Sequence, residues 1–118
     1  MKMRIGALMD TLGVGRQYRG YAMSVDAVCC VMENEEQLRN VRELVLEPLA
    51  EKYCCRWECV GRNIRTVIRR CWQTNPAKLQ QMAAYPLTGE PTVSEFLWIV
   101  TAYVQRVEEG WERSKGRL

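Results

Sequence analysis

Residues 56–70 contain five arginines and only one glutamate. Arginine is suited to nucleic-acid recognition, because its planar guanidinium pairs with the edge of guanine and its charge pairs with phosphate. The ordinary alternative is a helix face in contact with water, which is the usual reason for a run of charged residues. The arrangement of the arginines on their secondary-structure element distinguishes the two interpretations.

The spacing predicts a helix over 57–72 with one apolar and one polar face. At about 100° per residue, the apolar side chains fall within an arc of about 140°, wide enough to pack on a core. The apolar face comprises Trp57, Val60, Ile64, Val67, Ile68, Cys71 and Trp72. The polar face comprises Glu58, Arg62, Arg65, Thr66, Arg69 and Arg70. Such a helix can dock by its apolar side and place its arginines in a DNA major groove.

The preceding segment completes a helix-turn-helix at about 48–72. Leu49, Ala50 and Tyr53 form a short apolar stripe, and a small residue such as Ala50 lets a second helix cross closely. The turn at 54–56 consists of two cysteines and an arginine, so no Ser, Thr, Asp or Asn caps the second helix. We therefore expect the start of that helix to depend on tertiary packing.

Helical spacing continues through most of the chain, which predicts an all-α domain of about six helices. Capping boxes are expected at Asn34–Gln37 and Thr92–Glu95. Asn75 is expected to cap the short helix whose first turn contains Pro76, and Pro48 is expected to end or kink a helix. The further helices are expected at 3–13, 17–33, 34–48, 76–84 and from 92 onward, with a loop at 85–91. The inward-facing positions are expected to be Met3, Leu8, Met9, Leu12, Tyr21, Val25, Val28, Met32, Leu38, Val41, Leu44 or Val45, Phe96, Leu97, Val100, Val104, Val107 and Trp111.

Length and composition indicate one small globular domain covering residues 1–118. A hydrophobic content of 47% excludes intrinsic disorder, and 118 residues can bury one core but not two. The net charge is only +3, so an argument for nucleic acid depends on where the positive charge lies. No secretory hydrophobic segment and no apolar run of about 18 residues occurs, which predicts a cytoplasmic protein without a membrane span.

Six cysteines invite a metal or redox interpretation, but most have a simpler one. Cys29, Cys30 and Cys71 lie in apolar helical stretches, where cysteine behaves as a small hydrophobe. The cluster at 54, 55 and 59 has no histidine and no paired CxxC to complete a zinc site, so we expect no metal. Redox sensing by these turn cysteines stays an alternative to simple packing.

No catalytic pattern is present. The chain has no histidine to act as a base, no glycine-rich phosphate loop and no GxSxG motif. A cysteine nucleophile without a histidine partner would be atypical. We expect neither an enzyme nor a cofactor.

From about Ile5 to Glu109 the chain resembles the C-terminal effector domain of stage-zero sporulation protein A, a response regulator of endospore-forming bacteria. Four segments carry the resemblance in the same order: LGVGRQYRGY (12–21), LAEKY (49–53), VGRNIRTVIRRCW (60–72) and EPTVSEFLWIV (90–100). The resemblance implies a six-helix domain that binds DNA through residues 57–72 and controls transcription.

The resemblance also implies roles for individual side chains. The implied base contacts are Arg62, Arg65, Glu58, Cys59 and Thr66, and the implied phosphate contacts are Arg56, Arg69, Arg70 and Lys52. The family pattern has an arginine and a glutamate where this chain has Cys59 and Gly61. Each bidentate base contact is worth about 1–3 kcal/mol, so these two departures should change or weaken the family's sequence preference.

The partner predicted from these features is double-stranded DNA, bound by a homodimer or by domains in tandem, with RNA polymerase or another regulator as a further partner. No receiver domain fits in the 118 residues, so phosphorylation of a receiver is not expected to be the switch. The competing interpretation is a protein-interaction module that kept the fold but lost operator reading. Cys59 and Gly61 favour that module, whereas the arginine face favours DNA.

Overall fold

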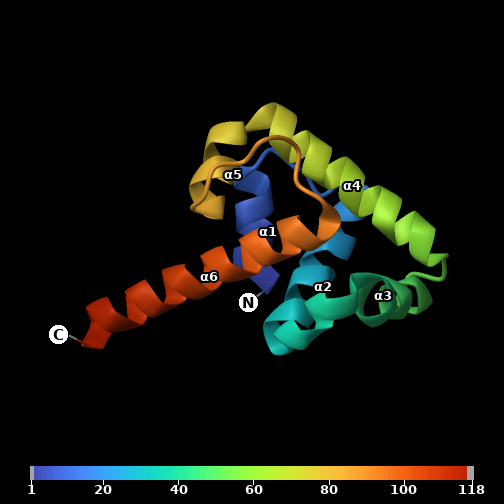
Figure 1. The fold of residues 1–118 in the computed structure, drawn as a ribbon, viewed down its shortest axis with the longest axis horizontal. Helices are drawn as coiled ribbons and strands as arrows, with labels where there is room; N and C mark the ends of the chain where they lie inside the picture. Colours follow the sequence, from blue (N-terminus) through green and yellow to red (C-terminus); the bar gives the residue numbers. More distant parts are fainter. Residues whose placement is uncertain (1, 117–118) are drawn as a thin grey trace.

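The structure is a computed structural model that describes residues 2–116, with side chains up to Glu108. Its described residues contain helices and no strands, which confirms the predicted all-α fold. In chain order, the elements are α1 (Lys2–Thr11), α2 (Arg19–Glu33), the 3₁₀ helix η1 (Glu35–Asn40), the π turn η2 (Arg42–Leu46), α3 (Glu47–Lys52), α4 (Trp57–Thr74), α5 (Pro76–Ala83) and α6 (Val93–Gly116) (Figure 1). No helix within the described range is both long and apolar enough to cross a bilayer.

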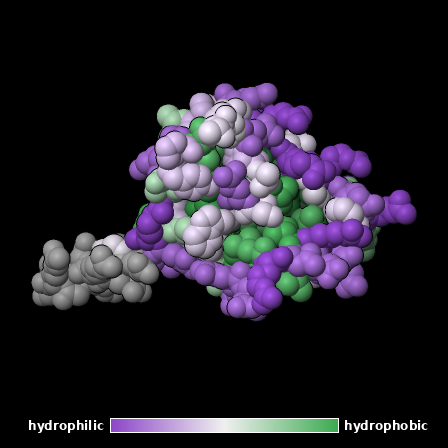
Figure 2. Space-filling view, in the orientation of Figure 1, coloured by the Kyte–Doolittle hydropathy of each residue, from purple (hydrophilic) through white to green (hydrophobic). Residues whose placement is uncertain are grey.

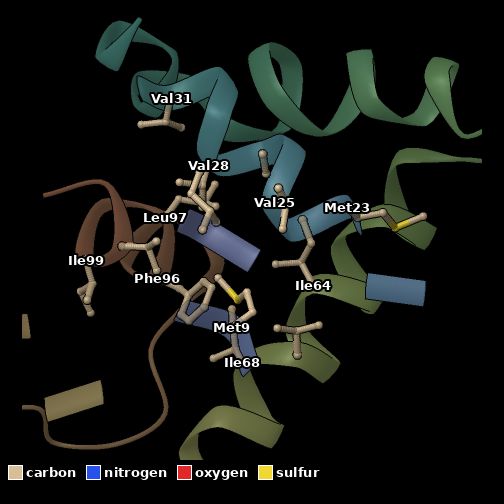
Figure 3. Packing of buried hydrophobic residues seen from close by; sticks show 14 of the residues in the cluster. Met9, Met23, Val25, Val28, Val31, Ile64, Ile68, Phe96, Leu97 and Ile99 are labelled. Atoms are coloured by element: carbon tan, nitrogen blue, oxygen red, sulfur yellow. The ribbon is translucent and has the colours of Figure 1, made fainter. Parts of the chain in front are cut away.

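Helix α2 lies at the centre, and α1, α4 and α6 all pack against it. Figure 2 shows hydrophilic side chains along the outer edge that α4 forms, with hydrophobic ones gathered nearer the centre of the same face. In the interior, Met9 of α1, Ile64 and Ile68 of α4, and Phe96 of α6 converge, and each is fully buried (Figure 3). Burying one such side chain stabilises the fold by about 1.5–3 kcal/mol. The core therefore fixes α4 by its inner face.

Three predicted helix caps are confirmed. The side-chain oxygens of Asn34, Asn75 and Thr92 accept backbone N–H bonds of 3.1, 3.3 and 3.2 Å, which satisfy donors left free at a helix start. The reciprocal half of each predicted capping box is absent. The Glu95 carboxylate accepts a bond from the Tyr85 hydroxyl instead, and the side-chain oxygen of Gln37 has no partner among the described residues.

Pro48 does not end the helix that precedes it. The chain stays helical through η2 and α3, and Pro48 occupies the first turn of α3. In η2 the N–H of Glu47 donates to the carbonyl of Arg42, five residues back, which is the hydrogen bond of a π turn. Proline lacks an N–H and crowds the carbonyl four residues earlier, and one wider turn relieves that conflict. The first helix of the helix-turn-helix therefore continues from η2.

Some predicted core positions were wrong because they lie at helix ends that extend beyond the helices packed against them. Met3 is 89% exposed and Val107 is 50% exposed, whereas Ile5 is fully buried. Of the two alternatives Leu44 and Val45, Val45 faces inward, and Tyr21 and Met32 pack against the core although they are only half-buried. Figure 1 shows the C-terminal part of α6 projecting beyond the other helices. The predicted contribution of Trp111 lies outside the described side chains.

Candidate nucleic-acid interface

Helix α4 is docked by the face that its sequence predicts. Val60, Ile64, Val67, Ile68 and Cys71 are fully buried, and Trp57 and Trp72 are half-buried at the edges of that face. The opposite face is open to solvent along its length: Glu58, Arg62, Arg65, Thr66, Arg69 and Arg70 are all exposed. The predicted division of the helix into two faces is confirmed, and the arginine side is accessible to a partner.

The exposed arginines differ in whether their side chains already form hydrogen bonds or ion pairs within the domain. The Arg69 Nε lies 3.6 Å from a carboxylate oxygen of Glu90, and the Arg70 Nε donates to the carbonyl of Gly13 at 3.2 Å. Within the described part of the chain, neither Arg62 nor Arg56 forms an ion pair. Arg62 therefore presents an uncompensated charge near the middle of the exposed face.

The Arg65 side chain lies against its own helix, beside Gly61. A Cβ added at Gly61 would lie 3.5 Å from Nη1 of Arg65 and 3.6 Å from Leu46. The Arg65 guanidinium thus folds back over the glycine, on the side of α4 that faces η2. From this position the Arg65 side chain has to extend away from α4 in order to reach a partner that lies against the exposed face.

The start of α4 lacks a side-chain cap, as the sequence predicts. Arg56 is extended at the N-cap position, and its side chain makes no capping bond. The guanidinium of Arg42 lies 4.3 Å from the ring centroid of Trp57, a cation–π contact between η2 and the first residue of α4. The sequence did not identify Arg42, because nothing in its spacing shows that η2 lies beside the start of α4.

The N-terminus of α2 packs closely against the backbone of α4. A Cβ on Gly20 would lie 2.3 Å from the carbonyl oxygen of Asn63 and 2.8 Å from Val67, so only glycine fits there. The neighbouring Arg19 is exposed and acts electrostatically on Cys55 in the turn. Arg19 thus adds positive charge beside α4. In the sequence, the one sign of a role for Arg19 was that it lies in the segment 12–21, which resembles the family.

Lys52, an expected phosphate contact, is held by an acidic residue. Its Nζ donates to Oδ2 of Asp26 at 2.7 Å, the Tyr53 hydroxyl donates to the same oxygen at 2.6 Å, and Lys2 lies 3.2 Å from the other oxygen. Burial by itself raises the pKa of Asp26, but the bonds from Lys52, Tyr53 and Lys2 outweigh it and hold the pKa below its ordinary value. This cluster ties α1, α2 and α3 together.

We expect Asp26→Asn to lower the free energy of unfolding by about 1–3 kcal/mol at neutral pH, since a buried charged acceptor loses its donors. Because the folded-state pKa of Asp26 lies below its unfolded-state value, this carboxylate stabilises the protein fully above about pH 4, and the stabilisation is lost progressively as the pH falls from there through the folded-state pKa. The raised pKa values of Lys52 and Tyr53 stabilise the protein fully below about pH 10, and this stabilisation is lost progressively as the pH rises from there through their folded-state pKa values. Urea denaturation of wild type and variant at pH 3, 7 and 11 should therefore show the largest difference at pH 7. A difference independent of pH would contradict this account.

Comparison with protein families adds one finding. The model of the family described as "Sporulation initiation factor Spo0A C terminal" matches residues 5–104. This range contains α2 to α5 complete, including the exposed arginines of α4.

Proposed function

The chain belongs to the family of Spo0A C-terminal domains, which are DNA-binding regulators of sporulation and not enzymes, and on this basis we propose that it recognises specific DNA sequences through α4. The observation that carries the proposal is the accessible arginine face of a helix whose other face is fully engaged in the core. A regulator of this kind acts on chromosomal DNA, so the proposed location is the cytoplasm.

The proposed roles follow from the position and engagement of each side chain. Arg62 and Arg65 contact base edges, because arginine can donate two parallel hydrogen bonds to guanine. Glu58, Cys59 and Thr66 share or flank that face and complete the proposed set of base contacts. The proposed phosphate contacts are Arg56, Arg69 and Arg70, joined by Arg19 and Arg42 from the elements beside α4.

Lys52 is assigned differently. Its ammonium would have to leave or share the 2.7 Å contact with Asp26 in order to reach a phosphate. We therefore propose that Lys52 supports the orientation of α3 and does not contribute a principal DNA contact. Binding as a homodimer or in tandem, and contact with RNA polymerase, remain part of the proposal.

A second candidate is a protein-interaction module that kept the fold. Cys59 and Gly61 favour this alternative, because the family pattern has an arginine and a glutamate at these positions. The uncompensated charge of Arg62 and Arg56 favours DNA. The two candidates differ most in how their binding responds to salt.

The test is a fluorescence anisotropy titration of the purified chain into a duplex that carries the family's operator and into a scrambled duplex. The titration is repeated at several salt concentrations. For a DNA binder with about five phosphate contacts, the logarithm of the binding constant should fall with the logarithm of the salt concentration with a slope of about −4 to −5. We expect tighter binding to the operator than to the scrambled duplex. Equal but salt-dependent binding to both would point to a different target sequence, which selection from random duplexes would identify. No binding at low salt would contradict the DNA proposal and favour a protein partner.

A further inference from the structure

Three cysteines surround the start of the recognition helix. Cys54 and Cys55 immediately precede the N-cap residue Arg56, and Cys59 lies in the first turn of α4. All three are free thiols; Cys54 is exposed, and the other two are half-buried. No other part of the described chain places this many thiols beside a functional surface.

Cys55 and Cys59 lie at the same end of α4, one just before the N-cap residue and the other in the first turn. Both side chains are half-buried, and burial together with the neighbouring Cys59 thiol raises the pKa of Cys55 above its ordinary value. Both backbones are anchored, since the Cys55 N–H donates to Ala50 at 3.0 Å and the Cys59 N–H donates to Arg56 at 3.0 Å. Cys54 lies in the left-handed region with φ of 52° and is exposed. The pair that chain geometry brings together is therefore 55 with 59.

We propose that Cys55 and Cys59 close into a reversible disulfide when the protein meets a peroxide, and that this disulfide weakens DNA binding by α4. The first part concerns the thiols alone. The second part rests on the proposed function.

Hydrogen peroxide can supply the oxidising equivalents in two steps. Cys59 gives up its proton and its sulfur attacks one peroxide oxygen; the O–O bond breaks, and the departing hydroxide takes up that proton, which leaves a sulfenic acid and one water. The Cys55 sulfur then attacks the Cys59 sulfur, and the displaced hydroxide takes the Cys55 proton and leaves as a second water. Two thiols thus lose two electrons, and one peroxide is reduced to two waters. A dithiol reductant reverses the reaction by thiol–disulfide exchange.

The order of the two thiols follows from their surroundings. The Asn63 amide donates to the Cys59 sulfur at 3.5 Å, so a hydrogen-bond donor already stands beside the sulfur that would attack the peroxide. The raised pKa of Cys55 keeps that thiol protonated and suits it to the second, resolving step. Cys59 therefore reacts with the peroxide, and Cys55 closes the bond.

The disulfide would alter the DNA-facing surface through the first turn of α4. The Asn63 amide donates to the Cys59 carbonyl at 2.8 Å and to its sulfur, so it responds directly to movement of Cys59. Drawing Cys59 toward the turn changes the backbone that carries Arg56 and Glu58 and displaces Cys59 from the edge of the exposed face. We expect a loss of about tenfold in affinity, comparable to displacing one base-contacting side chain.

The thiol part is tested by peptide mapping of the full chain after treatment with hydrogen peroxide, with trypsin digestion under non-reducing conditions. Trypsin cleaves after Lys52, Arg56 and Arg62, so a 55–59 disulfide links the peptides YCCR and WECVGR, whereas a 54–55 disulfide stays within one peptide. We expect the linked pair in wild type and in the matched control Cys54→Ser. Its persistence in Cys55→Ser, or the formation of only intermolecular or sulfinic products in wild type, would overturn the proposal.

The functional part is tested by anisotropy with the same reduced and oxidised samples. Oxidised wild type and Cys54→Ser should bind DNA about tenfold more weakly than when reduced, and a dithiol should restore them. Cys55→Ser should not respond to peroxide. A linked pair with unchanged affinity would overturn the proposed switch. Failure of the reduced protein to bind any DNA would instead contradict the proposed function, while the peptide map would still decide the chemistry of the thiols.

Discussion

Replacement of Gly20 by alanine should destabilise the domain by about 1–3 kcal/mol or more, because the added methyl group has no space. Its Cβ would lie 2.3 Å from the backbone oxygen of Asn63 and 2.8 Å from a methyl group of Val67. A backbone oxygen in the middle of a helix cannot rotate away, so α2 and α4 have to separate. The core residues Ile64 and Ile68 lie on the same helix, and their packing should suffer too. Urea denaturation would measure the loss, and DNA affinity should fall with it because α4 moves.

Two other glycines provide matched controls. A Cβ on Gly61 would meet its nearest neighbours at 3.5 and 3.6 Å, which is ordinary van der Waals contact, and one on Gly89 would meet nothing within 4 Å. Gly61→Ala should therefore raise the free energy of unfolding by about 1 kcal/mol through helix propensity. Gly89→Ala should change it little. If Gly20→Ala were as stable as Gly89→Ala, the close approach of α2 and α4 would be refuted.

The features that the sequence predicted correctly are those that depend on local chemistry. The two faces of α4 follow from helical spacing alone, and they are the faces that the core and the solvent occupy. The caps at Asn34, Asn75 and Thr92 depend on neighbours only two or three residues away, and all three formed. The helix predicted over 57–72 corresponds to α4, which starts at the same residue and ends two residues later, at Thr74.

The errors arose where distant parts of the chain meet. The inward face of α1 was correct at Met9, but nothing in its periodicity indicated that Met3 lies beyond any partner. The π turn at η2 lets the helix continue past Pro48, which lacks an N–H and crowds the carbonyl four residues earlier. The Asp26 cluster joins three helices that are separated in sequence, so Lys52 could not be recognised as its member.

The candidate site shows the same division. Sequence spacing indicated which arginines share the exposed face, but not that Glu90 holds Arg69 or that Gly13 holds Arg70. It also could not indicate that Arg42 stacks on Trp57. These contacts come from a loop, a connecting segment and a π turn, whose courses are set by tertiary packing. The assignment of roles within the arginine face therefore required the structure.

Arg62→Ala should weaken binding to the specific site by about 1–3 kcal/mol, the value of one bidentate base contact, and weaken non-specific binding less. Arg62 is exposed. Arg65 lies over Gly61 and Arg69 is paired with Glu90, whereas Arg62 forms no ion pair within the described chain. Anisotropy with specific and scrambled duplexes would measure both losses. Stability should be unchanged, because the side chain contributes nothing to the core.

Two further variants decide what kind of contact Arg62 makes. Arg62→Lys keeps the charge but loses the planar fork, so a base contact predicts weaker specific binding with non-specific binding retained. A phosphate contact predicts little change in Arg62→Lys, and in Arg62→Ala a salt slope reduced by about 1 with equal losses on both duplexes. Arg39→Ala is the control for charge alone, since Arg39 is exposed on η1 and paired with Glu36. Equal losses in Arg62→Ala and Arg39→Ala would mean that α4 attracts DNA only through net charge, and that its exposed face does not distinguish one sequence from another.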